Sequence, residues 1–218
     1  MNSLDVKNMF NEISRRYDFI NQVISFCMHK VFKLQAINSL EIDSNMKILD
    51  LCCGSGDIAI LIKEKFPENE VIGVDFSSEM LKIARTKNKQ INFIEADVLN
   101  LPFKDNSFDV LTIAFGFRNI ENKQKALDEI FRVLKKDGKL LHLDFEGKSR
   151  FAFIYDKIIL FFLRFFVKNL EPYKYLINSK NAFYESRELI EVFANRGFEF
   201  MKCEKLFFNV VSYHLFKK

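Results

Sequence analysis

Short apolar runs alternate with longer amphipathic segments along the first two thirds of the chain. The runs are apolar nearly throughout, which is typical of strands that are covered on both faces. They lie at 47–53, 71–76, 91–97, 109–117 and 139–145. Segments of helical character lie between several of them, at 58–66, 77–88 and 122–138. This alternation predicts an α/β fold with right-handed crossovers and a mostly parallel sheet with helices on both faces.

The ends of two of these helices carry capping signals. Ser77 and Ser78 are good N-cap residues for the second helix. Gly138 follows a helix whose apolar residues share one face, and glycine commonly stands just after the end of a helix. We therefore expect the second helix to begin at the serines and the third to stop at the glycine.

The C-terminal part of the chain predicts antiparallel strands. A helical segment at 186–196 precedes two strand-like runs, at 199–208 and 210–217. Asn209 alone separates these runs, so they predict a tight closing hairpin or a strongly bent edge pair. We expect them to form an antiparallel edge on the otherwise parallel sheet.

The composition is that of an ordinary globular protein. Hydrophobic residues at 49% and charged residues at 28% exclude a disordered chain, and 218 residues suit one domain. Four cysteines are too few and too scattered for a disulfide framework. The first 19 residues contain no uninterrupted apolar segment of the signal-peptide type. These features predict one domain in a reducing cytoplasm.

The stretch ILDLCCGSGD, at 48–57, follows the first predicted strand. Open parallel sheets bind ligands beyond the carboxyl ends of their strands. Gly54 and Gly56, on either side of Ser55, allow a sharp turn and leave room for a ligand against bare main chain. Asp50, four residues before Gly54, suits the cationic sulfonium and amino-acid part of S-adenosylmethionine. The same carboxylate would be a poor neighbour for the pyrophosphate of a dinucleotide, so we interpret this loop as an S-adenosylmethionine site.

Two further carboxylates end the next strands. Asp75 follows VIGV, where it can accept hydrogen bonds from both hydroxyls of a ribose. Asp97 ends the third strand within reach of an adenine amino group, and Val98 follows it at the same edge. We therefore count Asp75, Asp97 and Val98 among the cofactor-binding residues.

Cys52 and Cys53 could suggest metal chemistry, but the pattern around them does not support it. Adjacent residues on a strand point to opposite faces, so the two thiols cannot easily bind one ion. The sequence offers no C-x-x-C motif or histidine cluster to complete a site. We interpret both as small packing residues and expect no metal.

Several longer motifs carry a resemblance to a known family. They are RRYDFINQVISFCMH (15–29), LDLCCGSGD (49–57), VDFSSEML (74–81), EADVLNLPFKDNSFD (95–109), AFGFRNI (114–120) and RVLKKDGKLLHLDF (132–145). With them the chain resembles the demethylmenaquinone and 2-methoxy-6-polyprenylbenzoquinol methylases, which are C-methyltransferases of quinone biosynthesis. The leading motif and FGFRN are the most specific. The chain departs from the pattern at Phe32, where the family has tryptophan, and at Asp144, where it has glutamate.

The resemblance implies a Rossmann-like class I methyltransferase that uses S-adenosylmethionine and methylates a ring carbon of a polyprenyl quinol, in menaquinone or ubiquinone biosynthesis. It covers nearly the whole chain and divides the single domain into three parts. We expect an N-terminal helical cap at 1–45, a cofactor-binding core at 46–146 and an acceptor- and membrane-facing part at 147–218.

FGFRN places Arg118 and Asn119 after the fourth strand, at the ligand-binding edge. A quinol ring carbon becomes nucleophilic when an adjacent hydroxyl, with a pKa near ~10, loses its proton. Arginine is permanently cationic, so we assign Arg118 to holding the phenolate and Asn119 to orienting the second oxygen. The alternatives are that Arg118 pairs with a surface carboxylate and that Asn119 caps the helix near 122.

The proton acceptor is left open. His142 lies in the middle of a predicted strand, which favours a buried structural histidine over a catalytic one. His29 belongs to the leading motif and is as often structural as functional. Tyr155 and Asp156 match a pair in the family and could approach the quinol or anchor the chain.

The segment from 148 to 180 suggests a membrane surface. Its basic residues exceed its acidic ones by five, whereas the whole chain carries a net charge of +4. Lys157, Arg164 and Lys168 share one stripe of an otherwise apolar helix at 151–168. This pattern suits peripheral contact with the anionic inner face of a cytoplasmic membrane, and central charges argue against a transmembrane span. Alternatively, the helix packs on the sheet, lines a tunnel for a polyprenyl tail or forms the seam of a homodimer.

Two other functions stay open. The chain could methylate another hydrophobic acceptor, such as a sterol or a phospholipid amine, or it could be a catalytically silent cofactor-binding subunit of a quinone pathway. Nucleic acid is not an expected partner, because the basic residues are interleaved with an apolar helix and not spread along a polar groove.

Overall fold

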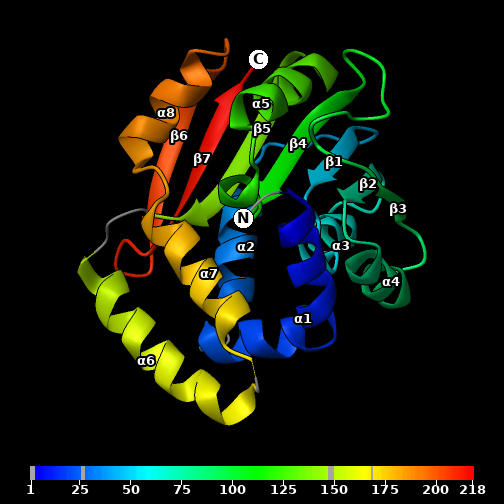
Figure 1. Ribbon diagram of the computed structural model, residues 1–218. Helices are drawn as coiled ribbons and strands as arrows, with labels where there is room; N and C mark the ends of the chain where they lie inside the picture. Colours follow the sequence, from blue (N-terminus) through cyan, green and yellow to red (C-terminus); the bar gives the residue numbers. More distant parts are fainter. Residues whose placement is uncertain (1–2, 26–27, 147–149, 168) are drawn as a thin grey trace.

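The computed structural model describes residues 3–25, 28–146, 150–167 and 169–218, and the described strands form one seven-stranded sheet (Figure 1). The strand order is β3-β2-β1-β4-β5-β7-β6. The neighbours from β3 to β5 pair in parallel, whereas β7 is antiparallel to both β5 and β6. The strands are β1 (Lys47–Leu51), β2 (Glu70–Asp75), β3 (Asn92–Glu95), β4 (Phe108–Ala114), β5 (Leu134–Phe145), β6 (Glu199–Leu206) and β7 (Val211–Lys217). The predicted α/β class with an antiparallel C-terminal edge is confirmed.

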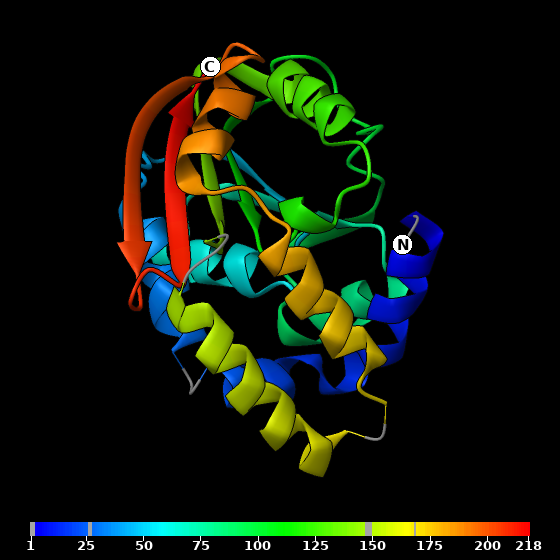
Figure 2. The same ribbon diagram turned by 60° about the vertical axis from the view of Figure 1, so that its left-hand side comes forward.

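Helices cover both faces of the sheet and the edge where the parallel strands end. They are α1 (Ser3–Ile24), α2 (His29–Asn38), α3 (Asp57–Lys65), α4 (Ser78–Lys87), α5 (Lys123–Val133), α6 (Arg150–Phe166), α7 (Glu171–Asn181) and α8 (Ser186–Ala194), with a short 3₁₀ helix, η1 (Phe117–Asn119). One core cluster joins the sheet to α2, α3 and α4, and a second joins it to α5 and α8. A third cluster joins α1, α6 and α7, which lie together across one end of the molecule (Figure 2).

The start of α4 agrees with the sequence, but the end of α5 does not. The Ser77 hydroxyl accepts a hydrogen bond from the backbone N–H of Met80 at 3.2 Å, which confirms the predicted cap. The helix predicted to reach Gly138 ends at Val133, and Asp137 takes the left-handed conformation with φ of 63°. The backbone groups of Asp137 and Gly138 bond to Lys218 at the C-terminus. A distant segment therefore converts the expected end of the helix into the start of β5.

The connection between β6 and β7 is longer and more strained than a break at Asn209 predicts. Phe207, Phe208 and Asn209 all have positive φ values, between 47° and 61°. Each left-handed non-glycine residue costs about 1–2 kcal/mol. This turn holds the Phe208 side chain 71% exposed.

The N-terminal and C-terminal parts of the chain are not separate units. Residues of α1 pack with residues of α6 and α7, while β6 and β7 complete the sheet of the core. The boundary expected near 147 falls outside the described residues. None of the described helices has both the length and the hydropathy that a membrane crossing needs.

Candidate active site

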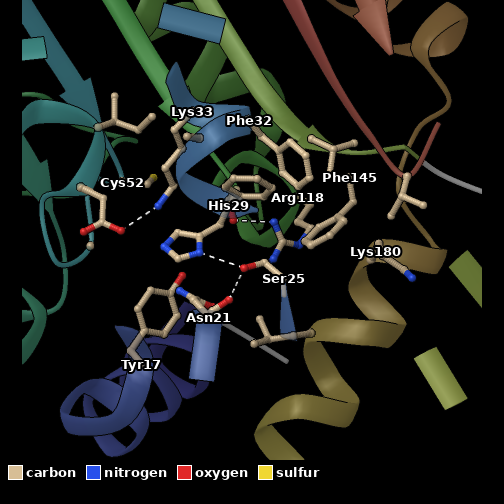
Figure 3. A pocket seen from close by; sticks show the side chains of 18 of the residues that line it. Tyr17, Asn21, Ser25, His29, Phe32, Lys33, Cys52, Arg118, Phe145 and Lys180 are labelled. Carbon is tan, nitrogen blue, oxygen red and sulfur yellow. Dashed lines mark hydrogen bonds and ion pairs between the residues drawn. The ribbon is translucent and has the colours of Figure 1, made fainter. Parts of the chain in front are cut away.

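Two adjoining cavities lie between the carboxyl ends of the parallel strands and the layer of α1, α6 and α7. The first, drawn in Figure 3, is lined by residues of α1, α2, α6 and α7 and of the loops after β1 and β4. The second lies over the ends of β2 and β3. The residues shared by both linings are Tyr17, Cys52, Gly54, Ala114 and Phe115.

The glycine loop forms the floor where the cavities meet. Gly54 has φ of 54°, and a Cβ placed there would meet no atom within 4 Å, so its main chain faces open space. Gly56 has φ of 85° and packs against Phe93 and Ala84, so it serves the turn into α3 and appears in neither lining. The Ser55 hydroxyl donates to Asp18 Oδ1 at 2.6 Å, which ties the loop to α1.

The paired cysteines belong to this turn and not to the strand. β1 ends at Leu51, and Cys52 takes a left-handed φ of 52°. A Cβ at Gly116 would lie 2.5 Å from the Cβ of Cys52, so only glycine fits there and the loop packs directly on FGFRN. Burial raises the pKa of both thiols, Cys52 and Cys53, well above the usual range. In the described parts of the chain, no cluster of His, Cys, Asp and Glu side chains could hold a metal ion.

Two buried carboxylates flank the glycine loop. Asp50 accepts hydrogen bonds from the Thr112 hydroxyl at 2.7 Å and from the Ala59 N–H at 3.2 Å, and burial raises its pKa to about 7. Asp75 accepts from the N–H groups of Gly54 and Ser77, each at 2.8 Å, and burial raises its pKa to about 6. Both carboxylates are therefore poorly solvated in a site that could receive a cation or hydroxyl donors.

The residues predicted to bind the cofactor divide between the cavities. Asp50 and Ser55 line the first, whereas Asp75, Asp97 and Val98 line the second. Gly54 lies in both linings. The structure thus brings all of them except Gly56 into the linings of two adjoining cavities.

Arg118 lines the first cavity, where its guanidinium is almost completely buried. Its Nη1 donates to Asp144 Oδ1 and to the carbonyl oxygen of Phe115, each at 2.6 Å. Burial raises the pKa of the Asp144 carboxyl, and the Arg118 charge opposes that rise. Arg118 does pair with a carboxylate, but Asp144 is fully buried and is not the surface partner of the alternative reading. Within the described residues, Arg118 Nε and Asp144 Oδ2 have no hydrogen-bond partner.

Asn119 lies apart from Arg118, in the lining of the second cavity. Its Nδ2 is 3.5 Å from the carbonyl oxygen of Phe115, and its buried Oδ1 finds no partner in the described parts of the chain. The cap of α5 is Asn122, whose side chain accepts from the N–H of Lys125 at 3.0 Å. The alternative that Asn119 caps this helix is therefore wrong, and the two residues assigned to one acceptor face different cavities.

The candidates for the proton acceptor, two histidines and the pair Tyr155 and Asp156, have different surroundings. His142 is buried among Phe117, Phe183 and Phe193, and burial lowers its pKa to about 3, so it is a neutral core residue. His29 lines the first cavity. Asp156 also lines it and is paired with Lys180 of α7, whereas the side chain of Tyr155 lies outside the described residues.

The leading motif lines part of the first cavity, and of its four residues there the sequence singled out only His29 as a candidate. Tyr17, Asn21, Ser25 and His29 stand at intervals of four and all face it (Figure 3). Tyr17 and Asn21 lie on one face of α1, which their spacing predicts, but Ser25 follows that helix and His29 begins α2. Lys180 was missed because its burial depends on the docking of α6 against α7.

A charged network closes one side of the first cavity. Lys33 lies 2.8 Å and Lys87 lies 3.0 Å from the carboxylate of Asp57, and Lys87 also lies 2.5 Å from Asp18. Burial would raise the pKa of Asp57, but the two lysines outweigh it and lower that pKa to about 2. The network connects α1, α2, α3 and α4 around the glycine loop.

Known proteins share both the sequence and the fold. A profile of the ubiE/COQ5 methyltransferase family matches residues 1–218. The demethylmenaquinone methyltransferase of Thermus thermophilus is 39% identical over 217 residues, which cover 95% of this chain and 98% of the relative. The demethylmenaquinone methyltransferase of Thermotoga maritima is 37% identical over 212 residues, which cover 94% of this chain and 92% of the relative.

Solved structures extend the comparison to the fold. A SAM-dependent methyltransferase from Thermotoga maritima superposes with a TM-score of 0.74 at 22% identity, covering 97% of this chain and 99% of that one. A SAM-dependent methyltransferase from Aquifex aeolicus gives a TM-score of 0.68 at 17% identity, covering 92% and 97%. These neighbours confirm the predicted Rossmann-like class I fold. The predicted methyl donor, S-adenosylmethionine, agrees with the family. From end to end, the chain belongs to the ubiE/COQ5 methyltransferase family.

Proposed function

We propose that this protein methylates a ring carbon of demethylmenaquinol, with S-adenosylmethionine as the donor. The observation that carries the proposal is a buried cation, Arg118, in an apolar cavity that adjoins the glycine loop. The name of the relatives in Thermus and Thermotoga supports a naphthoquinol as the acceptor. The sulfonium supplies an electrophilic methyl group when the cofactor is bound, so the chain has to position and activate the acceptor.

The residues around the two cavities suit the cofactor. The open main chain at Gly54 leaves the space that a ligand needs. We assign Asp75 to the ribose hydroxyls and Asp97 with Val98 to the adenine, because they line the second cavity. We assign Asp50 and Ser55 to the amino-acid and sulfonium side, because they line the first. By its place in the second cavity, Asn119 belongs to the nucleoside side.

Arg118 acts on the acceptor. A quinol hydroxyl has a pKa near ~10, so a phenolate forms at neutral pH only where its charge is stabilised. Arg118 pairs with Asp144 through Nη1, whereas its Nε has no partner in the described structure. Arginine is a permanent cation, so it can hold the phenolate. A preorganised cation in apolar surroundings stabilises a developing anion more strongly than the same cation does in water.

The remaining walls of the first cavity suit an isoprenoid tail. Ile159 and Leu163 of α6 and Leu176 and Ile177 of α7 line it with apolar side chains. α6 and the β6–β7 turn also expose apolar side chains: Ile158, Phe161, Phe166 and Phe208 are between 42% and 71% exposed. Both ribbon views place the β6–β7 turn beside the start of α6 (Figures 1 and 2). We propose that this end rests on the cytoplasmic face of an anionic membrane, from which the quinol enters.

The function is tested with purified protein, S-adenosylmethionine and a short-tailed demethylmenaquinol kept reduced. We expect a product one methyl group heavier by mass spectrometry, and slower turnover of a matched benzoquinol. Cells without the protein should accumulate demethylmenaquinone. Intact cofactor binding without turnover of either quinol would overturn the proposal and favour a silent subunit, and accumulation of an unmethylated benzoquinone would reassign the acceptor.

A further inference from the structure

The proton acceptor can be inferred from a pair of polar side chains at the junction of α1 and α2. Ser25 and His29 both line the first cavity, and Ser25 Oγ lies 2.8 Å from His29 Nδ1 (Figure 3). The same hydroxyl lies 2.5 Å from the carbonyl oxygen of Asn21. The cavity is the one that contains Arg118.

These two short contacts determine which nitrogen of His29 carries the proton. A serine hydroxyl has one hydrogen to donate, and a carbonyl oxygen can only accept. The hydrogen of Ser25 therefore goes to Asn21, and Ser25 Oγ must accept from Nδ1–H of His29. In the neutral imidazole the lone pair is then on Nε2, on the far side of the ring from Ser25. Burial and the nearby Lys33 charge lower the pKa of His29 below 6.5, so the neutral form prevails at pH 7.

We propose that His29 Nε2 is the proton acceptor for the quinol hydroxyl, and that Ser25 positions it by holding the proton on Nδ1. In this step the quinol O–H bond breaks, its electron pair stays on oxygen and an Nε2–H bond forms. Arg118 holds the resulting phenolate. Methylation replaces one ring hydrogen, so one proton leaves the site per turnover and no oxidant or reductant is needed. The inference rests on the proposed function, because the acceptor must carry an ionisable hydroxyl.

The charges around His29 come from several elements. Lys33 on α2 and Lys87 on α4 disfavour its protonation, while Asp57 on α3 and Asp18 on α1 favour it. Arg118, on the 3₁₀ helix η1 after β4, lines the same cavity. Burial and the two lysines outweigh the two carboxylates, so the net effect lowers the pKa of His29. Activity should therefore fall as the pH drops through a value below 6.5.

The tautomer can be observed without substrate. Burial lowers the pKa values of His142 and His214 to about 3, so neither should titrate between pH 5 and 8. In long-range ¹H–¹⁵N spectra of the full chain, the imidazole that disappears in His29→Asn should carry its proton on Nδ1 at pH 7.5. Ser25→Ala should lose that preference for Nδ1. A wild-type His29 protonated on Nε2 would overturn the proposal.

The catalytic role is tested by single-turnover methyl transfer with saturating cofactor. His29→Asn keeps a donor near the position of Nδ1 but lacks Nε2, so the rate should fall by ~10²–10⁴ and the acid limb of the pH profile should disappear. Ser25→Ala should keep the acid limb with a smaller loss of rate. The control is Lys30→Gln, on the exposed next position of α2.

The outcomes separate the two proposals. An active wild type with an equally active, folded His29→Asn variant, or an acid limb that persists in that variant, refutes His29 as the acceptor and leaves the function standing. A wild type that fails to methylate the quinol refutes the proposed function, and the assigned proton transfer with it.

Discussion

At the scale of single residues, the site concentrates charge where solvation is poor. Asp50 and Asp75 lie beside an open cavity with raised pKa values, and Arg118 and Asp144 form a pair with little access to solvent. Removing one partner of such a pair costs far more than the pair contributes, because the other charge stays buried. A variant that removes one of these charges therefore tests stability as well as function.

Asp75→Ala should weaken binding of S-adenosylhomocysteine at least tenfold, because each hydrogen bond to a charged group contributes about 1.5–3 kcal/mol. The affinity of the wild type should also fall as the pH drops through about 6, where the carboxylate gains a proton and loses acceptor capacity. Calorimetry measures both effects. An unchanged affinity in a folded Asp75→Ala variant would contradict the assignment.

Arg118→Lys should lower the single-turnover rate by ~10²–10³, because an ammonium lacks the planar fork that holds a phenolate oxygen. Cofactor affinity and melting temperature should change little, since the lysine can still face Asp144. In Arg118→Ala the free energy of unfolding is expected to decrease by about 3–5 kcal/mol, because the Asp144 carboxylate stays buried without its partner. Arg132→Lys, in a separate network with Glu129 and Asp105, is the control. A near-normal rate in Arg118→Lys would remove Arg118 from the mechanism.

Asp50 should make the cofactor-free protein less stable as the pH rises. Its pKa is about 7 in the folded chain and near 3.8 when unfolded, so the folded state binds more protons between these values. The free energy of unfolding then decreases with rising pH across that window. Urea unfolding of the wild type and of Asp50→Asn at pH 5 and pH 8 measures this. Relative to the wild type, the stability of Asp50→Asn should change less unfavourably from pH 5 to pH 8. His142 and His214 act in the opposite direction, so the comparison with Asp50→Asn is decisive and an unchanged pH difference would contradict it.

At the scale of elements, α6 and the β6–β7 turn combine inner and outer apolar faces. Ile159 and Leu163 point into the first cavity, while Lys157, Phe161 and Arg164 lie on the exposed side. The third basic residue of the expected stripe, Lys168, lies outside the described residues. The cavity wall and the proposed membrane face are thus two sides of one helix.

Replacing Lys157 and Arg164 with glutamine should weaken binding to anionic vesicles, by about 1 kcal/mol for each charge. Phe208→Ser should weaken it further, because this side chain is 71% exposed. Co-sedimentation with anionic and neutral vesicles is the measurement. Arg187→Gln and Lys202→Gln remove the same charge elsewhere on the surface and serve as controls. Equal binding to both kinds of vesicle would count against this membrane face.

At the scale of the whole molecule, α1 lies over the proposed cofactor site. Asn11 bonds to Ser77 and Asp18 to Ser55, each at 2.6 Å, so the helix is fastened to the start of α4 and to the glycine loop. A ligand in the second cavity would lie beneath Val6 and Phe10 of the same helix. We therefore expect entry and release of the cofactor to require a movement of α1.

Asp18→Ala should accelerate release of S-adenosylhomocysteine by about tenfold or more, because it removes charge-assisted bonds to Ser55 and Lys87 worth about 1.5–3 kcal/mol each. Stopped-flow displacement measures the rate. The exposed Asp43→Ala is the matched control. A release rate equal to that of the wild type would show that α1 does not limit exchange.

The order of strands and helices, the cap at Ser77 and the cofactor edge could be predicted from the sequence. Alternation of apolar runs, capping and the glycine turn depend on residues that are neighbours along the chain. The resemblance in FGFRN also located Arg118 correctly at the edge of the sheet. The predicted ends of two elements were wrong. Hydrogen bonds from the distant Lys218 accompany the early end of α5, and three left-handed residues lengthen the turn before β7.

Only the tertiary structure determined which side chains pair and which cavity each site residue lines. It pairs Arg118 with a buried Asp144, places Asn119 in the other cavity and brings Ser25 and His29 to face the acceptor space. These relations join segments far apart in the sequence, and the sign of each pKa shift depends on how packing balances burial against neighbouring charges. A linear pattern can name the ionisable residues, but the contacts that set their protonation exist only once the chain has folded.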